Sequence, residues 1–449
     1  MNAASVRWVC STETSPWQTM PVPTLKPNTD DTTPTIRVTA SKTYQTIDGF
    51  GGCFNELSWD ALSTLPDAER DGVLQSLFGD TGCGFMLGRI PIGASDFARN
   101  WYSHDETPGD LDLKHFSIAR DREALLPYIR AAMTIQPGLR CWGSAWSPPA
   151  WMKDNANYSG GSLIQTPEML QAYANYLVRW TQAYKAEGVN VYALTPQNEP
   201  NIVNVYPTCI WTGPQLREFI ANHLGPALRD SKTDVELWLG LNGDPPNAGD
   251  NANARLLPVM DDSKANEFIT GLAFQYDSKR QIALARDLYP TKKLMQSETV
   301  CFNGANSWAE AEDLFKSMKR HFDGGAGAYF MWNMALDDVS TSTWNWKQNS
   351  MITIDRKTHA VRFNGEYHVM RHFSQFVKPG AKRTLITGPW DDKAAFVNAD
   401  GSVVLVIGNT SNRSYDVPIS VTSAMPEDRN GTIQVTVPAH SINTFVVDR

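Results

Sequence analysis

Residues 191–200 read Val-Tyr-Ala-Leu-Thr-Pro-Gln-Asn-Glu-Pro, a short apolar run that ends in a polar Asn-Glu pair. A second segment of the same kind, residues 292–299, reads Lys-Lys-Leu-Met-Gln-Ser-Glu-Thr and also ends in a glutamate. In a (β/α)8 barrel the carboxyl ends of all strands open on one face, and the active site lies there. The two segments therefore predict a barrel in which Glu199 and Glu298 reach one pocket from different strands.

The alternation around these segments extends along most of the chain. Apolar or β-branched runs alternate eight times with stretches whose apolar residues recur at helical spacing. Such alternation favours parallel strands, and eight repeats favour a closed (β/α)8 barrel over an open sheet. The predicted strands are 46–52, 85–92, 139–146, 191–197, 236–242, 267–275, 292–297 and 326–334. The predicted helices include 121–136, 167–188, 214–230, 278–289 and 308–322.

The helix signals differ in clarity between repeats. The helix predicted over 167–188 has Thr166 as its N-cap, Pro167 at its first position and Gly188 at its end. The stretch after 236–242 is less clear, because Pro245-Pro246 and many Asn, Asp and Gly residues interrupt it. We therefore expect a long loop there that contributes to function.

The pattern changes after Gly380. Short alternating segments separated by turn residues replace the strand–helix repeat, which predicts an antiparallel β module. These segments are 384–387, 394–398, 403–407, 415–421, 432–437 and 442–447. Isolated strands are also predicted at 5–10 and 35–39, so both chain ends are expected to build one β-sandwich. The predicted domains are residues 46–380 for the catalytic barrel, and residues 1–45 with 381–449 for the sandwich.

Composition limits the partners and leaves the compartment open. The net charge is −8 and the charges are interspersed, so no basic patch is available for nucleic acid. No run of 18 apolar residues predicts a membrane span. The six cysteines include no C-x-x-C pair, and most are predicted to be free and buried. No apolar signal stretch is present at the N-terminus, which fits a cytoplasmic protein or a secreted or periplasmic one whose signal has been removed. Nothing indicates an oligomeric state.

Two carboxylates at strand ends are the minimum equipment for hydrolysing a glycosidic bond. One must hold a proton near neutral pH and the other must be ionised, so their pKa values have to differ. Asn198 offers an amide to a sugar hydroxyl, and Tyr276 is placed to donate to Glu298 and keep it charged. We assign Glu199 as acid/base and Glu298 as nucleophile. A separation of about 5 to 5.5 Å between the carboxyl groups predicts retention, and about 6.5 to 9.5 Å predicts inversion.

The other predicted strands also end in residues that suit a sugar site. Amides and carboxylates bind sugar hydroxyls, and indoles cover the apolar faces of sugar rings. The strand ends supply Phe50-Gly51-Gly52, Arg89 with Asp96, Trp146, Asn198, Asn242, Tyr276 and Trp332-Asn333. The eight histidines are dispersed and no H-E-x-x-H occurs, so no metal site is predicted.

Five motifs follow one another between about residues 45 and 380. They are Gly49-Phe-Gly-Gly52, Arg89-Ile-Pro-Ile-Gly-Ala-Ser-Asp96-Phe97, Ser144-Ala-Trp146-Ser-Pro-Pro-Ala-Trp151-Met-Lys153, Gln197-Asn-Glu-Pro200 and Ser297-Glu-Thr299. Together they resemble glycoside hydrolase family 30, the family of lysosomal glucosylceramidase and its bacterial relatives. The resemblance implies a (β/α)8 barrel with an attached β-sandwich and a retaining double displacement without metal or organic cofactor. It also implies that Glu199 is the acid/base and Glu298 the nucleophile.

The same resemblance implies roles for further residues. Contacts to the terminal sugar carry over to Asp96, Trp146, Asn198, Tyr276 and Trp332. Arg89 matches a buried arginine that orients the nucleophile, and a plain ion pair in the core is the alternative interpretation.

Two segments depart from the glucosylceramidase-like pattern. Ala273-Phe-Gln-Tyr276 keeps the tyrosine but lacks the His-Trp that precedes it there. Cys53-Phe-Asn-Glu56 differs from the small-residue and Thr-Asp pattern and looks closer to bacterial β-glucosidases or β-fucosidases. Glu56 is therefore a candidate for binding an outer hydroxyl of the sugar, although glutamates just past a strand are more often solvated or ion-paired.

The predicted function is the hydrolysis of β-linked gluco- or fuco-type sugars at the ends of oligosaccharides or glycoconjugates. The alternatives are an endo-acting β-glucanase or xylanase of the same family, and a carbohydrate-binding barrel without catalysis. Dinucleotide binding is disfavoured because Gly49-Phe-Gly-Gly52 lacks the G-x-G-x-x-G spacing. Serine-triad chemistry is disfavoured because no G-x-S-x-G elbow occurs.

Overall fold

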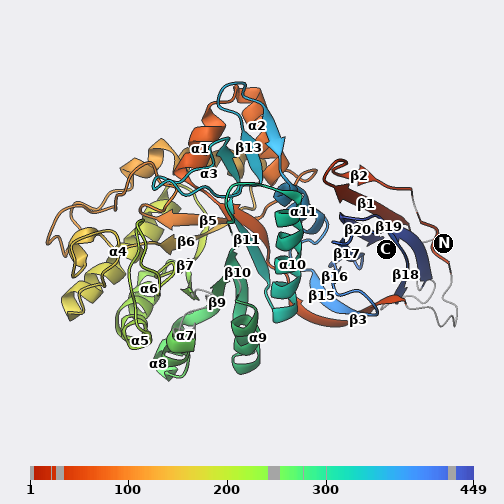
Figure 1. Ribbon diagram of the computed structural model, residues 1–449. Helices are drawn as coiled ribbons and strands as arrows, with labels where there is room; N and C mark the ends of the chain where they lie inside the picture. The colour runs from red at the N-terminus through yellow and green to blue at the C-terminus, as the bar shows by residue number, and fades with distance from the viewer. Residues whose placement is uncertain are drawn as a thin grey trace.

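The computed structural model describes residues 5–21, 23–26, 35–240, 253–276, 278–299, 301–422 and 431–448. It contains a closed eight-stranded barrel surrounded by helices and, beside the barrel, a separate nine-stranded sheet (Figure 1). The predicted combination of a (β/α)8 barrel and an attached antiparallel β-sandwich is confirmed, except that one pair of strands in the second domain, 36–46 with 415–422, is parallel.

All eight predicted barrel strands are present, and they pair in parallel in chain order with the last closing on the first. They are β4 (Gly49–Cys53), β5 (Leu87–Ile92), β6 (Arg140–Ala145), β7 (Val191–Thr195), β8 (Glu236–Gly240), β9 (Ile269–Gln275), β10 (Lys293–Glu298) and β11 (Ala328–Asn333). The candidate Asn242 and the long loop expected around Pro245-Pro246 lie outside the described residues.

The predicted helices are also present, some of them divided. The stretch 121–136 is a 3-10 turn, η1 (Ala119–Glu123), followed by α3, and 214–230 is α5 and α6 joined by the π-helical η3 (Ile220–Leu224). Between β4 and β5 lie two helices that the sequence analysis did not single out, α1 (Glu56–Ser63) and α2 (Asp67–Phe78). The other helices around the barrel are α3 (Leu125–Ile135), α4 (Pro167–Ala186), α5 (Gly213–Phe219), α6 (Gly225–Ser231), α7 (Asn253–Met260), α8 (Ser263–Phe268), α9 (Lys279–Leu288), α10 (Trp308–Gly324) and α11 (Gly365–Ser374).

Local sequence explains where the helices begin. The Thr166 side chain accepts a hydrogen bond from the Met169 backbone at the start of α4, as its predicted role as N-cap requires. At the start of α10, Ser307 and Glu310 form a reciprocal capping box, and the helix ends at Gly325 in the left-handed region. These signals mark the starts of α4 and α10, whereas α1, α2, α3, α9 and α11 have no side-chain hydrogen bond at their N-caps.

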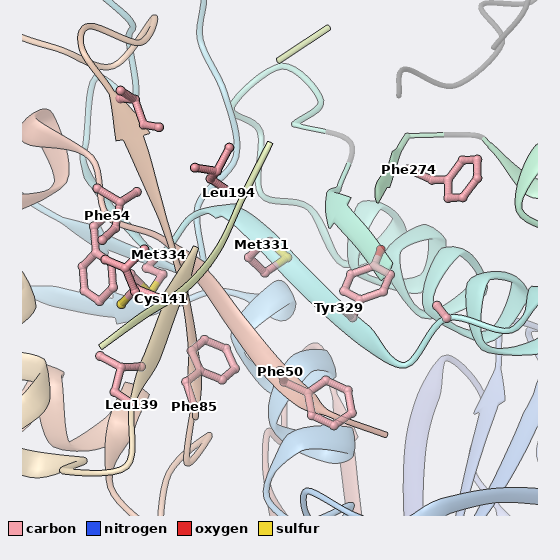
Figure 2. Packing of buried hydrophobic residues seen from close by; sticks show 14 of the residues in the cluster. Phe50, Phe54, Phe85, Leu139, Cys141, Leu194, Phe274, Tyr329, Met331 and Met334 are labelled. Carbon is pink, nitrogen blue, oxygen red and sulfur yellow. The ribbon is translucent and has the colours of Figure 1, made fainter. Parts of the chain in front are cut away.

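The strands bury opposite faces in two different cores, because successive side chains of a strand alternate in direction. In β11, Tyr329 and Met331 point outward into the layer between barrel and helices, whereas Ala328 and Phe330 point into the barrel. Figure 2 shows members of the outer layer, among them Cys141, Leu194, Tyr329 and Met331. The same alternation places Trp332 inside the barrel at its carboxyl end, in a separate cluster.

The glycines of β4 permit close approach of the neighbouring strand. A Cβ on Gly51 would lie 2.0 Å from the backbone oxygen of Leu87, so any side chain there would force β4 and β5 apart. The glycine-rich start of the barrel is therefore a requirement of strand packing.

The second domain is one hydrogen-bonded sheet in the order β19-β18-β3-β15-β16-β17-β20-β1-β2. Its strands are β1 (Val6–Thr12), β2 (Gln18–Thr19), β3 (Ile36–Thr46), β15 (Lys382–Thr387), β16 (Lys393–Val397), β17 (Val403–Asn409), β18 (Tyr415–Thr422), β19 (Gly431–Val437) and β20 (Ser441–Val447). Residues from strands far apart in this order, such as Val435 of β19 and Trp8 of β1, belong to one apolar core, so the sheet curves around it. Both chain ends contribute strands, and β1 pairs with β20. The exact domain boundaries stay a prediction.

Helices α10 and α11 lie between the barrel and this sheet (Figure 1). Phe322 of α10 packs on Phe373 of α11 and on Phe396 of β16, with ring centroids 5.7 and 5.4 Å away. His372 of α11 bonds the hydroxyls of Ser11 and Thr444, each at 2.8 Å. This mixed apolar and polar contact joins the sheet to the side of the barrel. Three short strands, β12 (Ala335–Asp337), β13 (Ile352–Ile354) and β14 (Val361–Phe363), form a small sheet after β11.

All six cysteines are free and buried, as predicted. Among the described residues, none of the helices combines the length and apolar character needed to cross a membrane.

Candidate active site

The two glutamates singled out from the sequence meet at the carboxyl end of the barrel. Glu199 follows β7, Glu298 is the last residue of β10, and both side chains are almost fully buried. The hydroxyl of Tyr276 lies 2.6 Å from Glu199 Oε1 and 3.1 Å from Glu298 Oε1. These two carboxylate oxygens therefore lie no more than about 5.7 Å apart, which is the sum of those two distances.

The backbone is strained at two of these three residues. Glu199 has φ 45° and Tyr276 has φ 48°, which places both in the left-handed region that non-glycine residues rarely occupy. Hydrogen bonds to neighbouring strands hold the segments: Asn198 N–H donates to the Ala145 carbonyl at 2.6 Å, and Tyr276 N–H donates to the Glu298 carbonyl at 3.1 Å. Such strain persists only where surrounding contacts over-determine it, and it is typical of functional sites.

Arg89 joins the nucleophile candidate to the rest of the site. Its Nη1 donates to Glu298 Oε2, and its Nη2 donates to Asn198 Oδ1 at 2.6 Å and to Ser144 Oγ at 3.2 Å. The side chain is 1 % exposed, so these charge-assisted bonds lie in a region from which water is largely excluded. Arg89 thus fixes the position of Glu298 relative to β6 and β7.

Aromatic rings enclose the guanidinium. Arg89 lies over Trp146, Trp142 and Trp332 at 4.5, 5.0 and 5.2 Å from the ring centroids. Trp146 and Trp332 stack on each other at 5.1 Å and form part of a cluster at the mouth of the barrel. Flat indoles of this kind suit the apolar face of a sugar ring.

The surroundings of the two carboxyl groups affect their pKa values differently. Burial raises the pKa of Glu199 to about 7, the negative charge of Glu298 adds to this, and hydrogen bonds from Tyr276 and Tyr206 oppose it. Burial also raises the pKa of Glu298, but the positive charge of Arg89 acts against that increase. When one proton is shared by the pair, this asymmetry favours a protonated Glu199 and an ionised Glu298.

Asp96 lies in the same site. Burial and the charges of Glu298 and Glu199 raise its pKa well above the usual range, and Gln348 Nε2 donates to Asp96 Oδ2 at 3.3 Å. Asn198 accepts at its oxygen from Arg89, and its amide nitrogen donates to none of the described residues, which leaves that donor for a substrate hydroxyl. The predicted residues Arg89, Asp96, Trp146, Asn198, Tyr276 and Trp332 are therefore gathered with the two glutamates.

Glu56 is placed differently. It begins α1, and its Oε2 accepts from the Arg99 backbone N–H at 2.7 Å and from Arg120 Nη2 at 3.2 Å. It is 3 % exposed, and burial raises its pKa despite these partners. Its carboxylate anchors the loop after β5, which corresponds to the ion-paired alternative; a direct contact with substrate stays a prediction.

Two residues of the site escaped the sequence analysis. Tyr206 donates from its hydroxyl to Glu199 Oε2 at 2.8 Å, although it lies in an irregular loop where no pattern marks it. Gln275 Nε2 donates to Asn198 Oδ1 at 2.6 Å and to Glu298 Oε2 at 3.2 Å. Gln275 is the last residue of β9, so the strand-end rule that selected Tyr276 could have found it.

Within the described residues, no group of three or more His, Cys, Asp or Glu side chains has an arrangement that could hold a metal ion. A buried pair of carboxylates with different proton affinities, linked through Arg89 to a cluster of indoles at the carboxyl end of a (β/α)8 barrel, defines a glycoside hydrolase.

Comparison with known families agrees with this class. The glycosyl hydrolase family 30 TIM-barrel domain matches residues 47–377, and the β-sandwich domain of the same family matches residues 392–445. The chain belongs to glycoside hydrolase family 30.

Several relatives match over most of their length. The putative glucosylceramidase 4 of Caenorhabditis elegans is 30% identical, with 94% of this chain and 85% of that protein covered. The endo-1,6-beta-D-glucanase of Neurospora crassa is 29% identical, with 87% and 84% covered. The crystal structure of SrfJ from Salmonella typhimurium superposes with a TM-score of 0.89 at 25% identity, covering 99% of this chain and all of that one.

Proposed function

We propose that this protein hydrolyses β-glycosidic bonds with retention of configuration, through a covalent glycosyl-enzyme formed on Glu298. The observation that supports this is the hydroxyl of Tyr276, which lies within 3.1 Å of both carboxylates and so limits their separation. The resulting bound of about 5.7 Å agrees with the spacing of retaining glycosidases, about 5 to 5.5 Å, and is shorter than the inverting range.

In the first step an ionised Glu298 oxygen attacks the anomeric carbon while the bond from that carbon to the leaving-group oxygen breaks. Glu199 transfers its proton to that oxygen. In the second step Glu199, now ionised, takes a proton from water, and the water oxygen attacks the anomeric carbon. The ester bond to Glu298 breaks, and both residues return to their starting forms.

The sugar we propose is a β-linked gluco- or fuco-type residue at the end of an oligosaccharide or glycoconjugate. Asp96, Asn198 and the stacked pair Trp146 and Trp332 supply the polar and apolar groups for one such ring. The relatives named as glucosylceramidase and as endo-1,6-beta-D-glucanase both have names that denote a glucosyl substrate. Gluco-type recognition is therefore common to the two kinds of relative.

An endo-acting β-1,6-glucanase is the second candidate, and one observation favours it. Tyr206, which contacts Glu199, lies 5.3 Å from the ring of Trp344, and Trp344 lies 5.1 Å from Trp346. The acid/base stands beside the leaving group, so this row of rings lies on the leaving-group side. A further glucosyl unit stacked on Trp344 or Trp346 would allow cleavage within a chain.

One experiment separates these possibilities. Purified protein is incubated with aryl β-glucosides, β-fucosides and β-xylosides and with β-1,6-linked gluco-oligosaccharides, and NMR records the first anomer and the product lengths. We expect the β-anomer first, with release of terminal sugar units from the oligosaccharides for the exo mode and of shorter oligosaccharides for the endo mode. The α-anomer first would overturn retention, and no turnover on any substrate would favour a binding protein.

Azide rescue tests the two roles separately. With a substrate bearing a good leaving group, Glu298→Gly is expected to give the α-glycosyl azide, because azide occupies the place of the missing nucleophile. Glu199→Ala is expected to give the β-glycosyl azide, because azide then attacks the glycosyl-enzyme. The same product from both variants would contradict the assignment.

A further inference from the structure

A small cavity lies inside the barrel below the two carboxylates. Its lining comes from several strands, with Trp142 and Ser144 of β6, Thr195 of β7, Gly240 of β8, and Ala273 and Gln275 of β9. Arg89, Asn198 and Glu199 border it from the active-site side. The space in it is about 10 Å³, which is room for the centre of a single water molecule.

Three buried polar atoms on residues that line this cavity have no hydrogen-bond partner among the described residues. They are Arg89 Nε, Trp142 Nε1 and Gln275 Oε1. Two of them are donors and one is an acceptor. Leaving such groups unpaired in a protein interior costs free energy, and buried polar atoms are paired with protein or with ordered water in most structures.

The orientation of the Gln275 amide explains why its oxygen faces away from the carboxylates. Its Nε2 donates to two acceptors, Asn198 Oδ1 and Glu298 Oε2. If the amide were reversed, its oxygen would meet both of these oxygens without a proton between them. The amide is therefore held in one orientation, and Oε1 is left without a donor among the described residues.

We propose that one ordered water occupies this cavity and makes Gln275 a positioning residue for Glu298. The water accepts from Arg89 Nε and Trp142 Nε1 and donates one proton to Gln275 Oε1. Its second proton is available to the hydroxyl oxygen of Thr195, which also lines the space and itself donates to Ser144 Oγ. A water in this place has the two to four polar partners that buried waters require. The role of Gln275 rests on the proposed function, whereas the water site does not.

The consequence concerns the charge of Glu298. The Gln275 N–H stabilises the ionised carboxylate, so a loosened amide makes Glu298 easier to protonate. The other charged or titratable groups that interact with this carboxylate are Arg89, Glu199, Tyr276, Tyr206, Asp96, Cys53 and Cys301. The substitutions chosen as tests leave all of them in place.

The first test is a crystal structure of the protein. We expect a density peak in the cavity at about 3 Å from Arg89 Nε, Trp142 Nε1 and Gln275 Oε1. An empty cavity, or a peak without contact to Gln275, would overturn the proposal. This outcome does not depend on which substrate the enzyme cleaves, so it separates failure of the water site from failure of the proposed function.

The second test compares Trp142→Phe with Trp180→Phe. Both indoles are buried and have Nε1 atoms without a partner among the described residues, but Trp180 lies in the outer core and does not line the cavity. Trp142→Phe and Gln275→Leu should each move the acidic limb of the kcat/KM profile to higher pH and lower kcat/KM at about pH 5 by roughly three- to tenfold. Trp180→Phe should leave the profile unchanged. If Trp142→Phe and Gln275→Leu only lower stability without moving the acidic limb, Gln275 is not a positioning residue.

Discussion

The interior of the barrel has two layers that differ in chemistry although the same strands build them. In the lower layer, Leu87, Trp142, Ala273 and Phe330 pack against one another as an apolar core. Two residues further along the same strands stand Arg89, Ser144, Gln275 and Trp332, which contribute to the site. The lower layer stabilises the fold by apolar packing. The upper layer contains buried charges, and the rest of the structure must offset the free-energy cost of burying them.

This comparison shows why the two functions can be separated within one barrel. Side chains two residues apart on a strand point to the same face. Each strand can therefore place one side chain in the apolar layer and the side chain two residues later in the site. Apart from Trp142, which also lines the cavity, residues of the two layers should therefore differ in what their substitution impairs: stability in the lower layer and activity in the upper one. The predictions that follow test this difference.

The largest expected effect is on activity, from the upper layer. Glu298→Gln keeps the shape of the side chain but removes the nucleophile, so kcat/KM should fall by at least about 10³-fold. Far-UV circular dichroism should show the same fold as in the parent protein. Turnover within tenfold of the parent would mean that Glu298 is not the nucleophile.

The next effect is on stability, from the lower layer. Phe330→Ala removes a buried ring that packs edge-on against Trp142 at 5.6 Å, so the free energy of unfolding should fall by about 3–5 kcal/mol. Activity at low temperature, per folded molecule, should stay within about tenfold. Urea titration with a parallel activity assay checks both. A variant that lost activity but kept its unfolding midpoint would remove the distinction between the layers.

The third effect is on the pH profile. Glu199 must be protonated for the first step, and burial raises its pKa to about 7, so kcat/KM should fall as pH rises above about 7. Glu298 must be ionised, and because its pKa is raised, the acidic limb should lie at higher pH than for an ordinary glutamate. A profile measured between pH 4 and 9 checks both limbs. Full activity at pH 9 would contradict the role of Glu199.

The same raised pKa has a consequence for stability. Folded Glu199 holds its proton up to about pH 7, whereas an unfolded glutamate releases it near 4.5. The stronger proton binding by folded Glu199 contributes to the free energy of unfolding. This contribution is fully present below pH 4.5 and is lost as pH rises through about 7. Burial raises the pKa of Glu366 to about 7 as well, so the comparison is between the parent and Glu199→Gln. The difference between their unfolding free energies should depend on pH in this window.

The smallest effect concerns the hydrogen bond from Tyr206. Tyr206→Phe removes the donor to Glu199 Oε2, so the ionised form loses support and the basic limb should move to higher pH by less than about one unit. Tyr128→Phe is the matched control, because Tyr128 is buried in the outer core and its hydroxyl has no hydrogen-bond partner in the part of the chain that the structure describes. Equal shifts in both variants would show that the hydrogen bond has no specific role.

The barrel strands and most strands of the second domain could be predicted because their signals are local, whereas α7, α8, α11 and the small sheet of β12, β13 and β14 were not predicted. Each barrel strand appears where an apolar run ends at a turn, and α4 and α10 begin at side chains that cap them. The helices α1 and α2 were missed because the short segment between β4 and β5 carries a weak apolar pattern. The division of 214–230 by a π-helical turn falls directly before Gly225-Pro226, a local signal for helix interruption that the prediction did not use.

The site could be predicted only in part. Glu199, Glu298, Arg89, Asn198 and Trp332 were found because strand ends of a barrel share one face. Tyr206 was missed because it reaches Glu199 from an irregular loop, and loop paths depend on contacts distant in sequence. Glu56 is the opposite case. The sequence made it a candidate for substrate binding, but its carboxylate accepts hydrogen bonds from the Arg99 backbone and the Arg120 side chain.

The amino-acid sequence by itself determined the order of strands and helices, the side chains at each strand end and the membership in a glycosidase family. Those properties follow from patterns of period two and 3.6 and from residue types at the ends of strands. Only the tertiary structure decided which oxygen faces which donor: that Tyr276 bridges both carboxylates, that Arg89 pairs with Glu298, and that Gln275 turns its oxygen away from them. The separation of the two carboxylates and their pKa values depend on distances and burial, which are established only once the strands have closed into a barrel.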